Sequence, residues 1–192
     1  MSSALLAPGS REFLDLFDSF AYSAYRLETL QCYGSSGEDS AFAAFLAGQP
    51  YLRHPGKEAW LSTIRAAREN RRWMGRVHVA IEPLSDYMAF ELTWAYAPNV
   101  AQGEDIRILP VPDVRWPSNL PHEDYWLFDS SQLYHMRYAD NSGTWLGAEH
   151  ITNPERVVEA CRGRDAAWSQ SLPWSEYVGT RPELASRLPE PS

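Results

Sequence analysis

The stretch R-V-H-V-A-I-E-P-L-S-D-Y-M-A-F-E-L, residues 76–92, joins a strand pattern to a helix start and decides the fold class. Apolar side chains at Val77, Val79 and Ile81 alternate with small or polar ones, which is the period-two pattern of a β-strand. Pro83 cannot donate a hydrogen bond to a neighbouring strand, so we expect the strand to end before it. The apolar residues that follow recur at helical spacing. The stretch therefore predicts a buried strand, a turn and a helix.

The turn between this strand and this helix is the first candidate site. In open α/β sheets, ligands gather where strands end and helices begin. The polar residues at this place are Glu82, Ser85, Asp86 and Tyr87. Ser85 or Asp86 also carries the oxygen that a helix N-cap needs, and a role as cap alone is the simpler interpretation. Both interpretations stay open at this point.

Size and composition favour one folded domain. A chain of 192 residues with 44% hydrophobic and 13% aromatic residues is long and apolar enough to form one core. The formal charge of −8 disfavours tight, direct binding of nucleic acid, which requires many cations. No apolar run approaches the length of a membrane span, so we expect a cytoplasmic protein without membrane contact. Cys32 and Cys161 have no metal-ligand spacing, and we expect free thiols, no metal and no cofactor.

Hydrophobic periodicity divides the chain into five helices and several strands. We expect helices at residues 10–28, 38–46, 58–72, 85–103 and 153–171, with Pro98 interrupting the fourth. We expect strands at residues 76–82, 106–109, 132–138 and 144–151, a buried segment at 125–128 and a hairpin turn at 140–143. This order predicts an α/β (α+β) domain over residues 10–178, with a mixed sheet and helices on its faces. Residues 1–9 are expected to be disordered, and residues 179–192 to form a flexible, proline-rich tail.

A wider set of charged and polar residues completes the candidate site. Glu91 interrupts an otherwise apolar helix face, and a buried carboxylate usually has a partner, which Arg26 or Arg107 can supply. The predicted ligand-binding set is Arg26, Glu28, Glu82, Ser85, Asp86, Tyr87, Glu91, Arg107 and Asp129. Such a network either fixes the fold as buried ion pairs, which is the favoured interpretation, or lines a pocket. In a pocket, a carboxylate can act as a general base or bind a cationic ligand.

Five segments in sequence order carry a family resemblance. They are F-D-S-F…Y-R-L-E-T (17–29), F-A-A-F-L-A-G (42–48), E-P-L-S-D-Y-M-A-F-E (82–91), N-V-A-Q-G-E-D-I-R-I-L-P (99–110) and Y-W-L-F-D (125–129). Through them, residues 17–177 resemble a bacterial family of single domains of unknown function that is common in actinobacteria. Members of that family are often encoded beside XRE-type helix-turn-helix regulators. The resemblance implies a regulatory neighbourhood without supplying a biochemical activity.

A more distant resemblance is to a half-domain of the phospholipase D-like fold. It rests on the expected strand order and on N-P-E-R-V…W-S-Q-S-L-P-W at residues 153–174. The active enzymes of that fold use a His-x-Lys pair. Here the only lysine, Lys57, follows His54 by three residues in an expected loop, so the resemblance implies a non-catalytic domain.

The functional expectation is a non-catalytic regulatory or interaction module. Its expected partner is a protein, such as a helix-turn-helix regulator, or a small ligand, and a homodimer stays open. The alternative is an enzyme on a small metabolite, with acid–base chemistry by Glu82, Asp86 or Glu91. A pocket with convergent polar groups around Ser85 favours the enzyme or a ligand sensor. A filled turn with an apolar patch elsewhere favours the partner-binding module.

Overall fold

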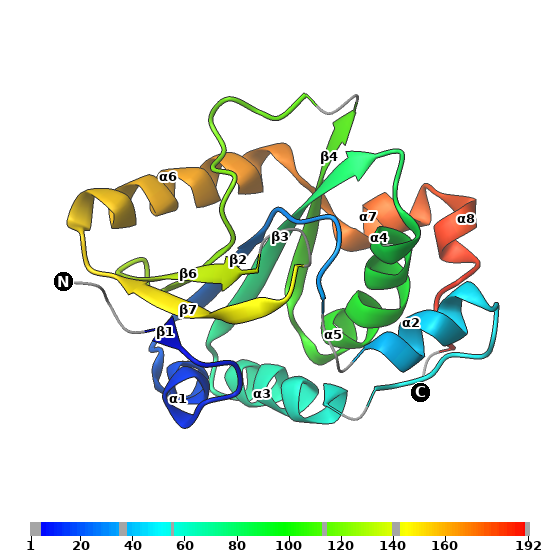
Figure 1. Cartoon of the computed structure of the whole chain (residues 1–192), viewed down its shortest axis with the longest axis horizontal. Helices are drawn as coiled ribbons and strands as arrows, with labels where there is room; N and C mark the ends of the chain where they lie inside the picture. The colour runs from blue at the N-terminus through cyan, green and yellow to red at the C-terminus, as the bar shows by residue number, and fades with distance from the viewer. Residues whose placement is uncertain (1–4, 35–37, 55, 113–114, 140–142, 191–192) are drawn as a thin grey trace.

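The chain forms one mixed, eight-stranded sheet with helices on both faces (Figure 1). The computed structural model describes residues 5–34, 38–54, 56–112, 115–139 and 143–190. The strand order is β1-β7-β6-β5-β2-β3-β4-β8. The predicted α/β class, with a mixed sheet covered by helices, is therefore confirmed. The phospholipase D-like topology is not confirmed.

Parallel and antiparallel strands meet at the middle of the sheet. Strand β3 (Trp73–Glu82) runs parallel to β2 (Ser23–Glu28) on one side and to β4 (Asp105–Pro112) on the other. Antiparallel strands extend the sheet beyond β2, namely β5 (Tyr125–Phe128), β6 (Gln132–Tyr138) and β7 (Trp145–Ile151). The two-residue strands β1 (Leu5–Leu6) and β8 (Leu172–Pro173) close the edges. The predicted turn of the β6–β7 hairpin lies mostly outside the described residues.

The first predicted helix is wrong in its second half. Helix α1 (Arg11–Ser19) ends at the C-cap Phe20, and residues 23–28 form β2 next to the centre of the sheet. Asp129 fixes the start of this strand, because its carboxylate accepts the backbone N–H groups of residues 21–23 at 2.7–2.8 Å. The apolar residues 20, 24 and 27 fit a helical spacing by coincidence. In β2, Tyr25 and Leu27 belong to one core cluster and Ala24 to another, as the two faces of a strand require.

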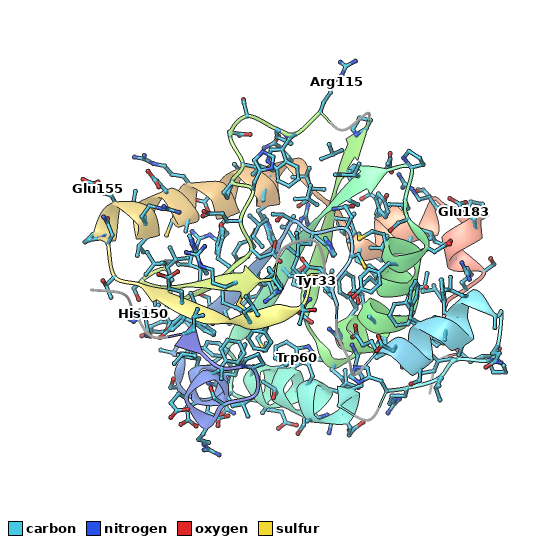
Figure 2. The ribbon with its side chains drawn as sticks, viewed as in Figure 1. Tyr33, Trp60, Arg115, His150, Glu155 and Glu183 are labelled. Carbon is cyan, nitrogen blue, oxygen red and sulfur yellow. The ribbon has the colours of Figure 1, made fainter. Side chains whose placement is uncertain are left out.

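The other helices lie close to their predicted bounds. They are α2 (Asp39–Leu46), α3 (Lys57–Glu69) and α6 (Pro154–Gln170). Two short helices that were not predicted follow, α7 (Trp174–Gly179) and α8 (Pro182–Ala185). In Figure 1, α6 covers one face of the sheet, and α1 and α3 cover the other. Trp60 and Tyr33 lie between the sheet and the helices of that second face, whereas Arg115 and Glu155 lie at the periphery (Figure 2).

The helix after the central strand contains a wide turn. Helix α4 (Asp86–Phe90) passes through the π-helical segment η1 (Glu91–Ala95) into α5 (Tyr96–Gln102). Pro98, inside α5, lacks the N–H group that a regular helix would offer to the carbonyl four residues earlier. The predicted interruption is thus seen one turn before the proline. Gly103 ends α5 at φ 112°, where a Cβ atom would lie 2.7 Å from the Arg68 side chain.

Both ends of the described chain contact the fold. Strand β1 pairs with β7, and Leu184 of α8 is buried against the α4–α5 region. The indole N–H of Trp94 donates to the Arg187 carbonyl at 3.1 Å. Within the described ranges, no helix has the length and apolar character to cross a bilayer.

Candidate functional site

A cavity of about 480 Å³ lies between the sheet and the helices that cover its second face. Part of its lining, the aromatic wall, consists of Phe13, Phe17, Trp60, Trp126 and Trp145. Polar residues from β2, β3, α3 and the α4–α5 run line the rest, and the Arg26 guanidinium lies 5.4 Å from the centroid of the Trp126 ring. The cavity thus combines apolar and charged surfaces in a volume that suits a small ligand.

The charged floor of the cavity is an ion-pair chain of Arg26, Glu28 and Arg76. Glu28 accepts the Arg26 Nε–H at 2.8 Å and an Arg76 guanidinium N–H at 2.7 Å. Arg76 also donates its Nε–H to Glu104 at 2.7 Å. Burial opposes ionisation of Glu28, but the two arginines outweigh it and hold its pKa well below the usual range. Both arginines are therefore committed to carboxylates that are already present.

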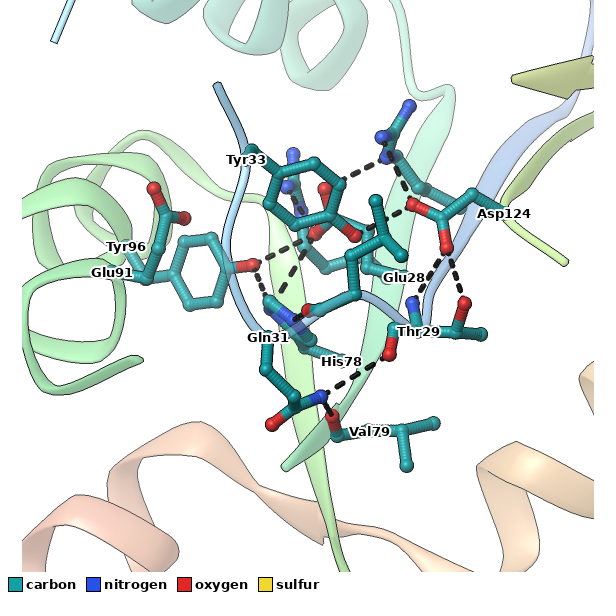
Figure 3. Close-up of polar contacts among 12 residues, drawn as sticks. Glu28, Thr29, Gln31, Tyr33, His78, Val79, Glu91, Tyr96 and Asp124 are labelled. Atoms are coloured by element: carbon teal, nitrogen blue, oxygen red, sulfur yellow. Dashed lines mark hydrogen bonds and ion pairs between the residues drawn. The ribbon is translucent and has the colours of Figure 1, made fainter. Parts of the chain in front are cut away.

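Tyr96 and His78 extend the charged floor toward the helices (Figure 3). The Tyr96 hydroxyl lies 2.7 Å from Glu28 and 2.6 Å from His78 Nδ1, while His78 Nε2 lies 2.8 Å from the Leu30 carbonyl. A carbonyl only accepts, so Nε2 carries the hydrogen, and burial lowers the pKa of His78 toward the neutral ring. The single hydroxyl hydrogen of Tyr96 consequently faces two acceptors.

Asp124 holds the segment that follows β2, around Tyr33, in place. Its carboxylate accepts the Thr29 N–H at 2.7 Å and the Tyr33 hydroxyl at 2.6 Å (Figure 3), and it also accepts the Tyr138 hydroxyl at 3.0 Å. Tyr138 in turn accepts from Arg26 at 3.0 Å. These bonds connect the segment after β2 to the charged floor.

Glu91 differs from the other buried carboxylates because it has no arginine partner. The expectation that Arg26 or Arg107 pairs with it is wrong: among the described residues, no salt bridge of 4.0 Å or less reaches Glu91, and its hydrogen bond comes from the Tyr87 hydroxyl at 3.2 Å. Arg26 pairs with Glu28 instead, and Arg107 donates to Ser171. Burial and the nearby Glu38 raise the pKa of Glu91 to about 8.

Lys57 lies beside this carboxylate without forming an ion pair to it. Its ammonium donates to the Ala95 carbonyl at 2.6 Å, at the end of the π-helical segment. Burial lowers the pKa of this ammonium group. The Lys57 ammonium group therefore satisfies a backbone carbonyl rather than the Glu91 carboxyl group.

The structure brings some of the predicted site residues together and separates others. Those that line the cavity are Arg26, Glu28, Tyr87 and Glu91. Ser85 and Asp86 are exposed, and Ser85 Oγ accepts the Met88 N–H at 3.1 Å as the N-cap of α4. Glu82 binds Arg181 and Tyr177, Arg107 packs on Trp168, and Asp129 caps the start of β2. The polar groups around the cavity, rather than the Ser85 turn, form the candidate site.

Several residues of the site have no clear signal in the sequence. They are Tyr33, Glu38, Lys57, Arg76, His78, Tyr96, Asn99 and Asp124. In the sequence, Arg76 follows a run of arginines that is typical of a solvated helix face, and Asp124 follows His122 and Glu123, so neither residue stands out as a buried group. One usable signal is that residues 76 and 78 alternate with Val77 and Val79, so a strand buried on both faces must bury them too. Among the described residues, no group of three or more His, Cys, Asp or Glu is arranged to hold a metal ion.

Comparison with known protein families identifies the family of this chain. Residues 11–179 match the family described as "Domain of unknown function (DUF6879)". No curated protein matched the sequence.

Proposed function

The chain belongs to the DUF6879 family of domains of unknown function, and we propose that it is a regulatory module that binds a small molecule in the cavity without transforming it. The observation that carries the proposal is the cavity of about 480 Å³, whose lining combines the aromatic wall with buried polar groups. Such a combination suits a ligand that has an apolar body and a polar end.

The internal neutralisation of the charged floor supports binding rather than transformation. Arg26 and Arg76 are each held by carboxylates at 2.7–2.8 Å, and Tyr96 adds a further hydrogen bond to Glu28. These contacts fix the positions of the side chains before a ligand arrives, which reduces the cost of ordering them on binding. A rigid, pre-formed surface of this kind favours recognition.

We propose that a protein partner reads out the bound ligand. A helix-turn-helix regulator is the partner that the family resemblance implies, and a homodimer is the other arrangement that we would look for. Gel filtration of the chain alone and with a helix-turn-helix regulator from the same genome, with and without ligand, tests this step. A ligand that leaves every elution profile unchanged would contradict it.

A second candidate function is acid–base catalysis on a small metabolite, and Glu91 is the observation that favours it. With a pKa raised to about 8 by burial and by Glu38, this carboxyl group is protonated at neutral pH and can donate a proton. Mass spectrometry of the ligand after incubation separates the two functions. Recovery of unchanged ligand supports the binding module, and conversion that is lost in Glu91→Gln supports the enzyme.

A ligand screen with a cavity-filling variant tests the proposed function. Ala95 lines the cavity, so Ala95→Leu should block binding, whereas Ala43→Leu places the same side chain on the exposed side of α2. The screen uses a defined set of small amines, acids and neutral aromatic compounds, read by thermal unfolding. At a ligand concentration of about 100 times the Kd, the stabilisation is roughly 2.7 kcal/mol, or on the order of 5–10 °C in Tm.

The result expected is a Tm increase by at least one compound in the wild type and in Ala43→Leu, measured against each protein's own baseline, and none in Ala95→Leu. The proposal is refuted if no compound in the set raises the Tm, or if a compound raises it equally in both variants.

A further inference from the structure

The lining of the cavity contains hydrogen-bond acceptors that have too few donors. These are Glu38, Glu91 and Asn99, which we call the acceptor end; Tyr87 lies beside the first two. The Tyr87 hydroxyl lies 3.2 Å from a Glu91 carboxylate oxygen and 3.4 Å from a Glu38 carboxylate oxygen. Because a hydroxyl has one hydrogen, it can satisfy only one of the two carboxylates at a time.

The cations of the described chain do not supply the missing donors. The closest positive group to Glu38 is the His54 ring at 3.7 Å, and burial lowers the pKa of His54, which favours its neutral form. Lys57 donates to the Ala95 carbonyl and lies beyond 4.0 Å from both carboxylates. Glu91 holds a proton of its own at neutral pH, and the Tyr87 hydroxyl is the one further donor that the described residues offer to Glu91 and to the half-buried Glu38.

Asn99 is an independent observation that points in the same direction. Its Nδ2 group donates to Glu104 at 2.7 Å, and this contact fixes the orientation of the amide because a carboxylate can only accept. Asn99 Oδ1 is then a buried acceptor without a hydrogen-bond partner among the described residues, on a side chain that is 2% exposed. Buried acceptors of this kind are usually satisfied, so a donor from outside the chain is the missing element.

The charge around the cavity has the same sign as the acceptor end. Three cations, Arg26, Lys57 and Arg76, line the cavity together with the carboxyl groups of Glu28, Glu38 and Glu91. Two further carboxylates, Glu104 and Asp124, lie next to Arg76 and Arg26 behind this lining. With Glu91 protonated at neutral pH, four negative charges are present for three positive ones. An anionic ligand would have to compete with carboxylates for arginines that are already paired. A cation would instead meet Glu38 and Glu91, which have no arginine or lysine partner among the described residues.

We propose that the cavity binds an organic cation, a protonated amine or a guanidinium group on an apolar body. The positive group donates to Glu38, Glu91 and Asn99 Oδ1, and the apolar body lies against Trp60, Trp126 and the rest of the aromatic wall. This inference rests on the proposed function and names the class of ligand. Aromatic faces near the site also favour a cation over an anion.

The test compares two probes that share a ring system and differ in charge. Tryptamine carries an ammonium group, and indole-3-propionic acid carries a carboxylate at a similar distance from the ring. Isothermal titration calorimetry at pH 7.5 should give a Kd for tryptamine that is about tenfold lower or more, as expected for a close charge pair in a desolvated site. In the empty site a proton neutralises the Glu91 carboxyl group, whose pKa is raised to about 8. A bound cation replaces this proton, so binding should release protons. The number released is obtained from the binding heat in buffers that differ in ionisation enthalpy.

Matched variants locate the contact. Glu91→Gln should weaken tryptamine binding by about tenfold or more, because the amide has no negative charge. Glu58→Gln, an exposed glutamate on α3 that pairs with Arg53, should leave the Kd within about twofold. Circular dichroism confirms that each variant folds, and the proton-release measurement on the wild type does not depend on any variant.

The outcomes separate this inference from the proposed function. Equal or tighter binding of indole-3-propionic acid, or an unchanged Kd in Glu91→Gln, overturns the cation assignment and leaves a ligand-binding module in place. Absence of binding by tryptamine also overturns the assignment. In that case the broader screen with Ala95→Leu decides on the proposed function.

Discussion

The two buried glutamates of the cavity should respond in opposite ways to the same substitution. Glu28 accepts hydrogen bonds from Arg26, Arg76 and Tyr96, so Glu28→Gln removes the charge that two buried guanidinium groups share. Breaking a buried ion pair from one side costs about 3–5 kcal/mol. For a domain of this size, that loss lowers the Tm by roughly 6–20 °C.

Glu91→Gln should cost much less stability. Its carboxyl group has a single hydrogen bond from Tyr87 at 3.2 Å and no ion pair of 4.0 Å or less within the described chain, and an amide oxygen can still accept that bond. We expect a loss of no more than about 1 kcal/mol from the changed hydrogen bond. At pH 7 the variant should even gain stability, because the wild type has to bind a proton at Glu91 in order to fold and the amide does not.

Urea unfolding and thermal melts at pH 7 measure both variants against the wild type. Equal losses in the two variants, or a Glu28→Gln protein that melts within about 2 °C of the wild type, would show that the charged floor does not stabilise the fold as described.

Two further predictions follow from single side chains. The stability of the wild type should fall as the pH rises from about 5 to about 8, because folded Glu91 keeps a proton, with its pKa near 8, that the unfolded chain releases near pH 4.3. This fall should be smaller in Glu91→Gln, and urea midpoints across that pH range measure it; identical slopes would contradict the assignment. Ser85→Ala should cost about 1 kcal/mol as a lost helix cap and leave ligand affinity unchanged, and a loss of binding with the fold intact would return the site to the Ser85 turn.

The sequence predicts the fold better than the site, and residues 20–28 show why. The central strand β3 is recognisable because apolar residues alternate along it and Pro83 marks its end. Strand β2 is missed because Phe20, Ala24 and Leu27 also fit a helical spacing, while the charged Arg26 and Glu28 break the apolar pattern of a buried strand. Their burial depends on each other and on Arg76, a residue that is 48 positions away from Glu28. Local periodicity contains no information about such a pairing.

The sequence predicts only part of the candidate site, because the pairing of its charged groups also depends on tertiary structure. Glu91 is recognisable as a buried carboxylate because its neighbours are apolar, and its burial is confirmed. Its missing arginine partner is not recognisable, since the partner of each charge depends on tertiary distances. Lys57 is an example: its ammonium group binds a carbonyl 38 residues further along the chain, in a turn whose π-helical form is itself a tertiary outcome.

The π-helical segment determines how the two halves of the helix that lines the cavity are rotated relative to each other about the helix axis. An α-helix advances about 100° per residue, so one extra residue in a turn rotates everything before it by that angle relative to everything after it. With this offset, Tyr87 and Glu91 on one half and Tyr96 and Asn99 on the other all line the cavity. A chain one residue shorter between 91 and 95 would keep its hydrophobic composition and both helical halves. It would turn either Glu91 or Asn99 away from the cavity, so the length of this turn decides whether the acceptor end exists.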